Sequence, residues 1–239
     1  AGITGVRTGP MRYTSARGLR SIVEHQATGL RPGGVRSATH VNAVGIDASG
    51  VTVDGEPFGA VALCLPDPQA GMLLDPSSPA GARVLEVLQQ VSWEPVIAVM
   101  AVFAPDVLPR FDGIFINDSD VLTWAAHDGH RRGDDAPVVI AHVHPALAAQ
   151  HLADPAAVIE LAIAALLPVL GIDERPLWTG AMRWTYAKPT SGRSDDCWFD
   201  AQLGVGLAGD SWAHGPKVEA AWLSGHALGA AISEWWRSN

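Results

Sequence analysis

The sequence predicts a mixed α/β fold in which a mainly antiparallel sheet is inserted into a second lobe. Three observations predict it. A helix and a block of strands occupy residues 1–75, strands of antiparallel type dominate residues 76–190, and a strand, a loop and a helix close the chain over residues 191–239. This order favours two lobes over a simple alternation of strands and helices. With 239 residues, 48% of them apolar, each lobe has enough material for a core.

The first third of the chain reads as a loop, a helix and a β block. Residues 1–14 are expected to be a loop. Ser15 is a candidate N-cap for a helix over residues 16–27 that stops at Gly29. Strands are expected over residues 35–46, 50–55 and 60–65. The last of these is a continuous apolar run, as is typical of a strand buried on both faces, and it ends at two closely spaced prolines.

The middle of the chain alternates between well-bounded helices and strands. A helix begins at Ser78-Pro79 and runs to about residue 90. Another is bounded by Asp154-Pro155 and Gly171. Strands are expected over residues 93–103, 138–143 and 176–186, with a hairpin formed by 113–116 and 121–126. The segment HDGHRRGDD, residues 127–135, is expected to be a solvated loop.

The last element is the most informative one. A short apolar strand over residues 205–208 breaks at Gly209-Asp210, and after a polar loop a helix begins near Lys217. Connections of this kind present backbone N–H groups and a helix N-terminus to an anionic ligand. Residues 204–209 also spell G-x-G-x-x-G, but these glycines fall inside the strand and not after it, so we interpret the match as a coincidence.

Composition limits the classes of partner. The net charge of −9 argues against nucleic acid and against an anionic membrane surface. No apolar run reaches the roughly 18 residues that a membrane span needs. The two cysteines show no metal-ligand spacing, so free thiols in a reducing cytoplasm are expected, with a single disulfide as the alternative. The expected partner is a small-molecule substrate.

Four motifs, in order along the chain, carry a resemblance to a known family. The end of the chain, Gly209-Asp210 followed by VEAAWLSG, resembles the C-terminal signature of FAD-dependent amine oxidases. HVNAV (residues 40–44) is similar to the strand of that family that reaches the adenine. ALCLPDPQA (residues 62–70) and RWTYAKP (residues 183–189) are similar to segments of its renalase-like branch. The resemblance implies a partial FAD/NAD(P)-binding lobe, with residues 1–75 and 191–239 in that lobe and residues 76–190 in a substrate domain.

The sequence departs from the family pattern at two places. Ala220 stands where the family usually has glycine, which places a methyl group where the cofactor would approach. The strand, G-x-G-x-x-G loop and helix with which the family opens are not found in these residues. The chain starts at Ala1 and not at Met, so we expect a fragment. The alternatives are that a second chain supplies the diphosphate-binding loop or that the protein has lost ordinary FAD binding.

The resemblance also implies a set of cofactor-binding residues. Gly209 would let the backbone approach the ribityl–diphosphate chain, and Asp210 would bind hydroxyl groups there. Amides at the start of the last helix would face the flavin pyrimidine and stabilise negative charge on it. Glu219 could equally be an ordinary first-turn helix residue. Val41 would contact the adenine through its backbone. The full set of candidates is Val41, Gly209, Asp210, His214, Lys217, Val218 and Glu219.

The candidate substrate-contacting residues are Trp184 and Tyr186. They lie two apart on a predicted strand and so share a face. In the family this strand borders the flavin, where aromatic rings shape a slot for an amine or a dihydropyridine-type substrate. Packing in the core is the alternative. The implied reaction is hydride transfer to FAD, with oxygen as the expected reoxidant.

Other chemistry finds less support in the sequence. The pairs His127 with His130 and His142 with His144 do not supply three or four converging ligands, so no metal is expected. Neither a nucleophile elbow nor a cysteine with a partner is visible. Two alternatives remain open, a non-catalytic binding module that keeps the lobe without the cofactor, and a hydrolase or metal enzyme that uses the histidines.

Overall fold

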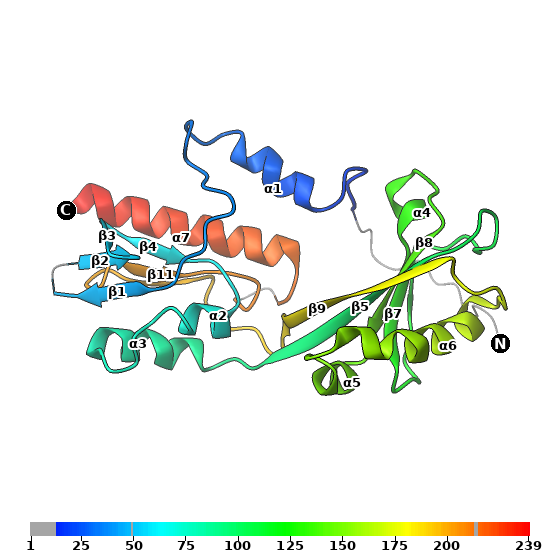
Figure 1. Cartoon of the computed structure of the whole chain (residues 1–239). Coiled ribbons are helices and arrows are strands. Elements are labelled where there is room, and N and C mark those ends of the chain that lie inside the picture. Colours follow the sequence, from blue (N-terminus) through cyan, green and yellow to red (C-terminus); the bar gives the residue numbers. More distant parts are fainter. Residues whose placement is uncertain (1–12, 49, 213–214) are drawn as a thin grey trace. The chain divides into compact units, whose positions relative to one another are not determined.

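Two compact units make up the chain in a computed structural model that describes residues 13–48, 50–212 and 215–239 (Figure 1). Unit 1 consists of Pro95–Thr185 and the described residues up to Ser37. Unit 2 consists of Ala38–Glu94 and Tyr186–Asn239, so its two parts are separated in sequence by most of unit 1. The predicted mixed α/β fold with antiparallel sheets is confirmed. The predicted ranges 1–75, 76–190 and 191–239 follow the resemblance and not compactness, and they stay a prediction.

Unit 2 contains two small sheets. An antiparallel meander is formed by β1 (Val44–Asp47), β2 (Gly50–Val53) and β3 (Glu56–Phe58). The second sheet has the order β10-β11-β4, from β10 (Trp198–Asp200), β11 (Val205–Leu207) and β4 (Val61–Leu63). In it, β11 is parallel to β4 and antiparallel to β10. The parallel pair joins the two sequence-distant parts of the unit, which places the loop after β11 beside the loop after β4.

Three helices complete unit 2, namely α2 (Asp67–Gly71), α3 (Pro79–Leu88) and α7 (Val218–Ser238). Ser78 caps α3 by accepting a hydrogen bond from the Gly81 amide at 3.4 Å, as predicted for a Ser-Pro start. Apolar residues of both sheets and of these helices form one core, which includes Val44, Ile46, Val51, Leu63, Ala70, Leu74, Val84, Leu88, Val205, Leu207 and Trp212.

Unit 1 is built on a five-stranded sheet of order β6-β7-β8-β5-β9. Its strands are β5 (Trp93–Val102), β6 (Gly113–Phe115), β7 (Leu122–His127), β8 (Val138–Val143) and β9 (Trp178–Pro189). The predicted hairpin is β6 paired with β7, and β8 runs antiparallel to both β7 and β5. Strands β5 and β9 are the longest, and each has residues in both units.

The core of unit 1 lies between one face of this sheet and a helix. The helix α6 (Ile159–Leu170) lies along it, preceded by the 3-10 turn η1 (Pro155–Val158) and by α5 (Pro145–Gln150) (Figure 1). The core contains Ile97, Val99, Ala101, Phe103, Leu122, Ala125, Val139, Ala141, Val143, Ala162, Ile163, Leu166 and Leu170. The remaining helices of the unit are α1 (Arg20–Ala27) and α4 (Asp128–Arg132).

The structure differs from the predicted elements in several short segments. The first strand begins at Val44 and not at residue 35, because the amides of Asn42 and Ala43 both donate to the Asp54 carboxylate at 2.9 and 3.0 Å and so leave no ladder there. The expected solvated loop at 127–135 contains α4, whose start packs tightly, since a Cβ on Gly129 would overlap the backbone of Ala136. The expected helix over 155–170 begins with the turn η1. The short elements α2, α5 and β10 were not predicted.

The expected first helix is also shorter than predicted and is confined to α1. Residues 1–12 of the predicted loop over 1–14 and the candidate His214 lie outside the described residues. Within the described part of the chain, we find no helix with the length and hydrophobicity required to cross a bilayer.

Candidate functional site

The centre of the candidate site is the connection from β11 to α7 in unit 2. Strand β11 is buried throughout and pairs with β4 in the register Val205↔Val61. Gly206 in β11 touches α7 so closely that an added Cβ would overlap Leu228 Cδ1 and lie 3.2 Å from Leu228 Cγ. The glycine therefore lets the helix lie directly on the strand, which fixes where the connecting loop begins and ends.

The predicted loop residue Gly209 is held against α7. Its amide donates to the hydroxyl of buried Ser224 on that helix at 3.1 Å. Its φ is 155°, a value that L side chains rarely adopt, and a Cβ would meet no atom within 4 Å. The backbone at Gly209 is therefore fixed in place yet open on the side where a side chain would point, as the predicted close approach of a ligand requires.

Asp210 follows in a half-buried position. Burial raises the pKa of this carboxyl, and the negative charge of Asp67 raises it further, while the backbone amide of Asp210 itself acts in the opposite direction. A ligand hydroxyl that donates to this carboxylate would stabilise its charged form against the cost of burial.

The N-terminus of α7 is available to a ligand. Lys217 is its N-cap residue in an extended conformation and provides no side-chain hydrogen bond to the first turn. Lys217, Val218 and Glu219 are all exposed, whereas Ala220 is 1% exposed and belongs to the interior of the unit. The first-turn amides and the positive end of the helix dipole are thus accessible to negative charge.

A buried ion pair beneath this loop was missed by the sequence reasoning. The side chains of Arg193 and Asp67 are 7% and 5% exposed, and Nη1 of the arginine lies 3.0 Å from Oδ2 of the aspartate. The same Nη1 donates to Ser211 Oγ at 2.7 Å, and the guanidinium lies 4.5 Å from the centre of the Trp212 ring. Trp93 Nε1 also donates to Asp67 at 3.3 Å.

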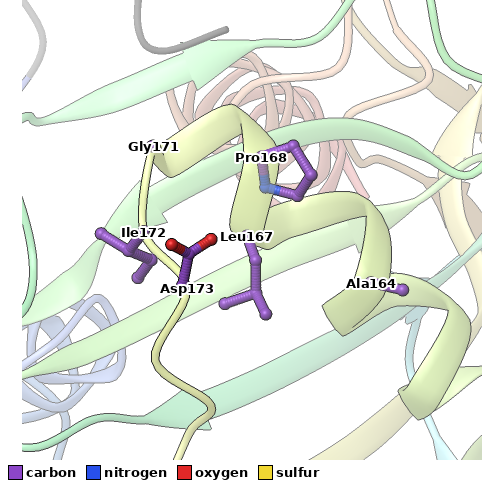
Figure 2. Close-up of a pocket in the computed structure, with 6 residues that line it drawn as sticks. All are labelled: Ala164, Leu167, Pro168, Gly171, Ile172 and Asp173. Carbon is purple, nitrogen blue, oxygen red and sulfur yellow. The ribbon is translucent and has the colours of Figure 1, made fainter.

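Two hollows accompany these elements. A cavity of about 420 Å³ in unit 2 is lined by the 191–195 loop, which includes Arg193, and by Val87, Gln90, Val91, Trp198 and Trp212. In unit 1, a hollow of about 510 Å³ lies at the C-terminal end of α6 (Figure 2). Figure 2 shows its lining, of which Asp173 is the single titratable residue. A lone carboxyl offers no acid–base pair, so the hollow of unit 1 shows no chemistry of its own.

Val41, the predicted adenine contact, is half-buried and packs against the core of unit 2 just before β1. The two amides that follow it are occupied by Asp54, and these hydrogen bonds hold the pKa of that carboxyl below its usual range. The backbone at this position is therefore ordered by the turn that joins β2 to β3.

The predicted aromatic pair lies on β9. Trp184 is 58% exposed and belongs to unit 1, and half-buried Tyr186 belongs to unit 2. Since Ala181 packs on the core of unit 1, even-numbered residues such as Trp184 point to the opposite face of the sheet. We call this the second sheet face. It also carries Trp124 and His142, which are paired across β7 and β8 with their rings 4.7 Å apart.

Charge on the second sheet face is limited. Burial lowers the pKa of His142, and the positive charge of Arg131 lowers it further. That arginine lies over the Trp124 ring at 5.5 Å and is within 3.5 Å of the Asp128 carboxylate. The face is therefore aromatic, with a neutral imidazole at neutral pH, and it suits a flat organic molecule.

The histidines that the structure describes do not gather into a ligand set. His144 lies beyond the end of β8 and caps α5 by accepting from the Ala146 amide at 3.3 Å. His127 is buried, with Nε2 3.3 Å from the Ala136 carbonyl, and His130 lies near two carboxylates. No group of three or more metal-ligating side chains is found in residues 13–48, 50–212 and 215–239.

Comparison with known proteins links this geometry to a family. The sequence model described as "Flavin containing amine oxidoreductase" matches residues 4–232. Among solved structures, a putative protoporphyrinogen oxidase from Exiguobacterium sp. 255-15 is similar with a TM-score of 0.66 at 19% identity, over 92% of this chain and 52% of that one.

Two amine oxidases are also similar in structure. Cyclohexylamine oxidase from Brevibacterium oxydans IH-35A has a TM-score of 0.67 at 14% identity, over 92% of this chain and 53% of that one. Putrescine oxidase bound to putrescine has a TM-score of 0.59 at 18% identity, over 91% and 53%. At these identities the likeness shows the fold, and the chain spans about half the length of each of these proteins.

Proposed function

The chain belongs to the flavin-containing amine oxidoreductases, and on that premise we propose that it supplies part of the FAD site of an oxidoreductase. The observation that carries the proposal is the β11–α7 connection, in which an open glycine backbone, a half-buried carboxyl and an uncapped helix N-terminus follow one another. These features fit the ribityl–diphosphate side and the pyrimidine edge of a flavin.

Each residue has a distinct part in this proposal. Gly209 admits the cofactor chain to the backbone, and Asp210 accepts hydrogen bonds from its hydroxyl groups. The amides at Lys217 and Val218, with the dipole of α7, stabilise negative charge on the reduced ring. Val41 is assigned to the adenine through its backbone. FAD, when bound, accepts a hydride from a substrate carbon.

Unit 1 contributes contacts to the substrate in this proposal. The second sheet face, with Trp184, Trp124 and His142, offers aromatic surface to a flat substrate, for which we propose an amine or a dihydropyridine-type compound. Tyr186, later on the same strand, is assigned to the same substrate. The motifs of residues 62–70 and 183–189 favour the renalase-like branch over other members of the family, and the cytoplasm stays the expected location.

The test is FAD binding by the protein in the form in which its cell makes it. The purified protein should show flavin absorbance bands, and FAD fluorescence should be quenched on titration. Lys217→Glu places negative charge at the N-terminus of α7, so we expect weaker FAD binding and a lower flavin reduction potential. Arg237→Glu makes the same charge change at the other end of α7 and is the matched control.

A colourless protein that takes up no FAD would overturn the proposal. That outcome would favour the alternative, a binding module that keeps the lobe without the cofactor. If Lys217→Glu and Arg237→Glu change FAD affinity and reduction potential equally, the N-terminus of α7 does not contact the cofactor. Lys217 and Val218 would then not belong to the site.

A further inference from the structure

We propose that Arg193 is a positioning residue that holds the Gly209–Trp212 segment in its ligand-binding position, acting through Ser211 and the main chain. The inference rests on the proposed function for its consequence in FAD binding, but its structural part stands independently. Neither the family match nor the motifs of the sequence point to this arginine, which lies in a polar loop without a recognisable pattern.

The first line of evidence is the number of segments that Arg193 joins. Its Nη1 contacts Asp67 on α2 and Ser211 Oγ in the loop after β11, at 3.0 and 2.7 Å. Its Nη2 donates to the carbonyls of Val87 and Leu88, at the C-terminal end of α3, at 2.9 and 3.5 Å. One side chain thus connects two helices with the loop that leaves β11.

The second line of evidence is that the main chain repeats the contact. The Arg193 amide donates to the Ser211 carbonyl at 2.8 Å, so Ser211 is held at both its carbonyl and its hydroxyl by the same residue. The next residue, Trp212, is 3% exposed and lies under the guanidinium. Asp210 directly precedes Ser211 and Trp212, so its position depends on the contacts that Arg193 makes with these two residues.

The third line of evidence is the free-energy cost of burying the charge of Arg193. The Arg193 side chain is only 7% exposed, so its charge requires compensation, and its Nε has no hydrogen-bond partner among the described residues. Apolar residues of similar volume often replace buried ion pairs without loss of stability. A site that keeps the pair, together with two helix-end carbonyls and a loop hydroxyl around it, is better explained by the precise placement of a loop than by stability.

A comparison of variants tests this inference with a readout that does not require FAD. Arg193→Met leaves the buried Asp67 carboxylate without its ion-pair partner, so this variant should lose both stability and loop order. The double variant Arg193→Met/Asp67→Asn removes both charges and should recover most of the stability, but it lacks the guanidinium contacts to the Ser211 hydroxyl and to the carbonyls of α3. Arg83→Met is the control, because Arg83 pairs with Asp200 in the same unit.

Amide hydrogen exchange of the protein without FAD is measured over residues 207–212. We expect exchange at least about tenfold faster than in the wild type for both Arg193 variants, and unchanged exchange for Arg83→Met. FAD affinity should fall by at least about tenfold in the double variant despite its recovered unfolding midpoint. The visible circular dichroism of bound flavin should change with it.

The outcomes separate the two proposals. If the wild type takes up no FAD, the proposed function fails, and the exchange data still decide the role of Arg193. If the double variant shows wild-type exchange over residues 207–212, Arg193 does not position the loop and the inference is wrong. The same conclusion follows if exchange increases evenly throughout unit 2, because the effect would then be general stability.

Discussion

The contact between Gly206 and Leu228 allows a double-mutant cycle whose outcome follows from the structure. Leu228 is 1% exposed on α7, and it occupies the space into which a side chain at position 206 would extend. Leu228→Ala removes a fully buried leucine, which costs about 3 kcal/mol of the free energy of unfolding. Gly206→Ala forces the new methyl against Leu228 Cδ1, at a cost of about 2 kcal/mol.

The two changes should compensate each other. In the double variant the added methyl no longer meets Leu228 and partly fills the cavity that its removal leaves. We therefore expect a loss of about 3 kcal/mol in place of the additive 5 or so, a coupling of about 2 kcal/mol. Equilibrium urea unfolding followed by tryptophan fluorescence measures all four proteins, and equal m-values would show that the same surface is exposed in each.

A matched glycine provides the control. Gly225 lies on α7 with no atom within 4 Å of where its Cβ would be, so Gly225→Ala should leave stability unchanged or raise it by up to about 1 kcal/mol. An additive double variant, with a loss near 5 kcal/mol, would show that β11 and α7 are not in direct contact. The placement of the whole Gly209 connection would then need another explanation.

Three further predictions concern charge and aromatic surface. Burial raises the pKa of Asp210, so its negative charge destabilises the folded state, and this effect grows as the pH rises through the ordinary and then the raised pKa. Asp210→Asn should therefore raise the unfolding midpoint at pH 7 more than at pH 4. The same variant should bind FAD more weakly in a titration. Trp184→Ala should lower kcat/KM about tenfold with a change in unfolding free energy within about 0.5 kcal/mol. Trp236→Ala, which removes a ring of similar exposure (63% against 58%) from the C-terminal end of α7, should leave kcat/KM unchanged. Burial lowers the pKa of His142, so the folded state favours the neutral ring, and stability is lost as the pH falls below the ordinary pKa of about 6.5. His142→Gln should therefore flatten a plot of unfolding temperature against pH in this range. An unchanged slope would show that another group causes the pH dependence.

Elements with strong local signals could be predicted from the sequence. The helix boundaries Ser78-Pro79 and Gly171 are visible because capping and helix termination depend on residue types next to one another. The break at Gly209 and the start of α7 were predicted for the same reason. Short elements such as α4 were not predicted, because a helix of about one turn is stabilised by its tertiary contacts and not by its own helix propensity. In α4 this contact is the close packing of Gly129 on Ala136.

The ion pair between Arg193 and Asp67 could not be predicted, because its two residues are 126 positions apart. Nothing local marks either one: Asp67 lies between two prolines and begins a short helix, and Arg193 lies in a polar loop. Burial of such a pair depends on the parallel pairing of β4 with β11, which brings the two loops together. The roles of Trp184 and Val41 stay predictions for a related reason, because a side chain's ligand depends on its surroundings and not on its type.

The same parallel pairing has a consequence for how the protein is made. Val205, the pairing partner of Val61, is synthesised 144 residues after it. The strands of the unit 1 sheet, in contrast, come from one nearly continuous segment. At typical rates of synthesis this interval lasts roughly 7–30 s, during which the edge of β4 has no native partner in the nascent chain. Unit 1 can form first, and unit 2 closes last. A slow refolding phase should therefore report on β11, and a chain that stops before it should be the species that chaperones retain.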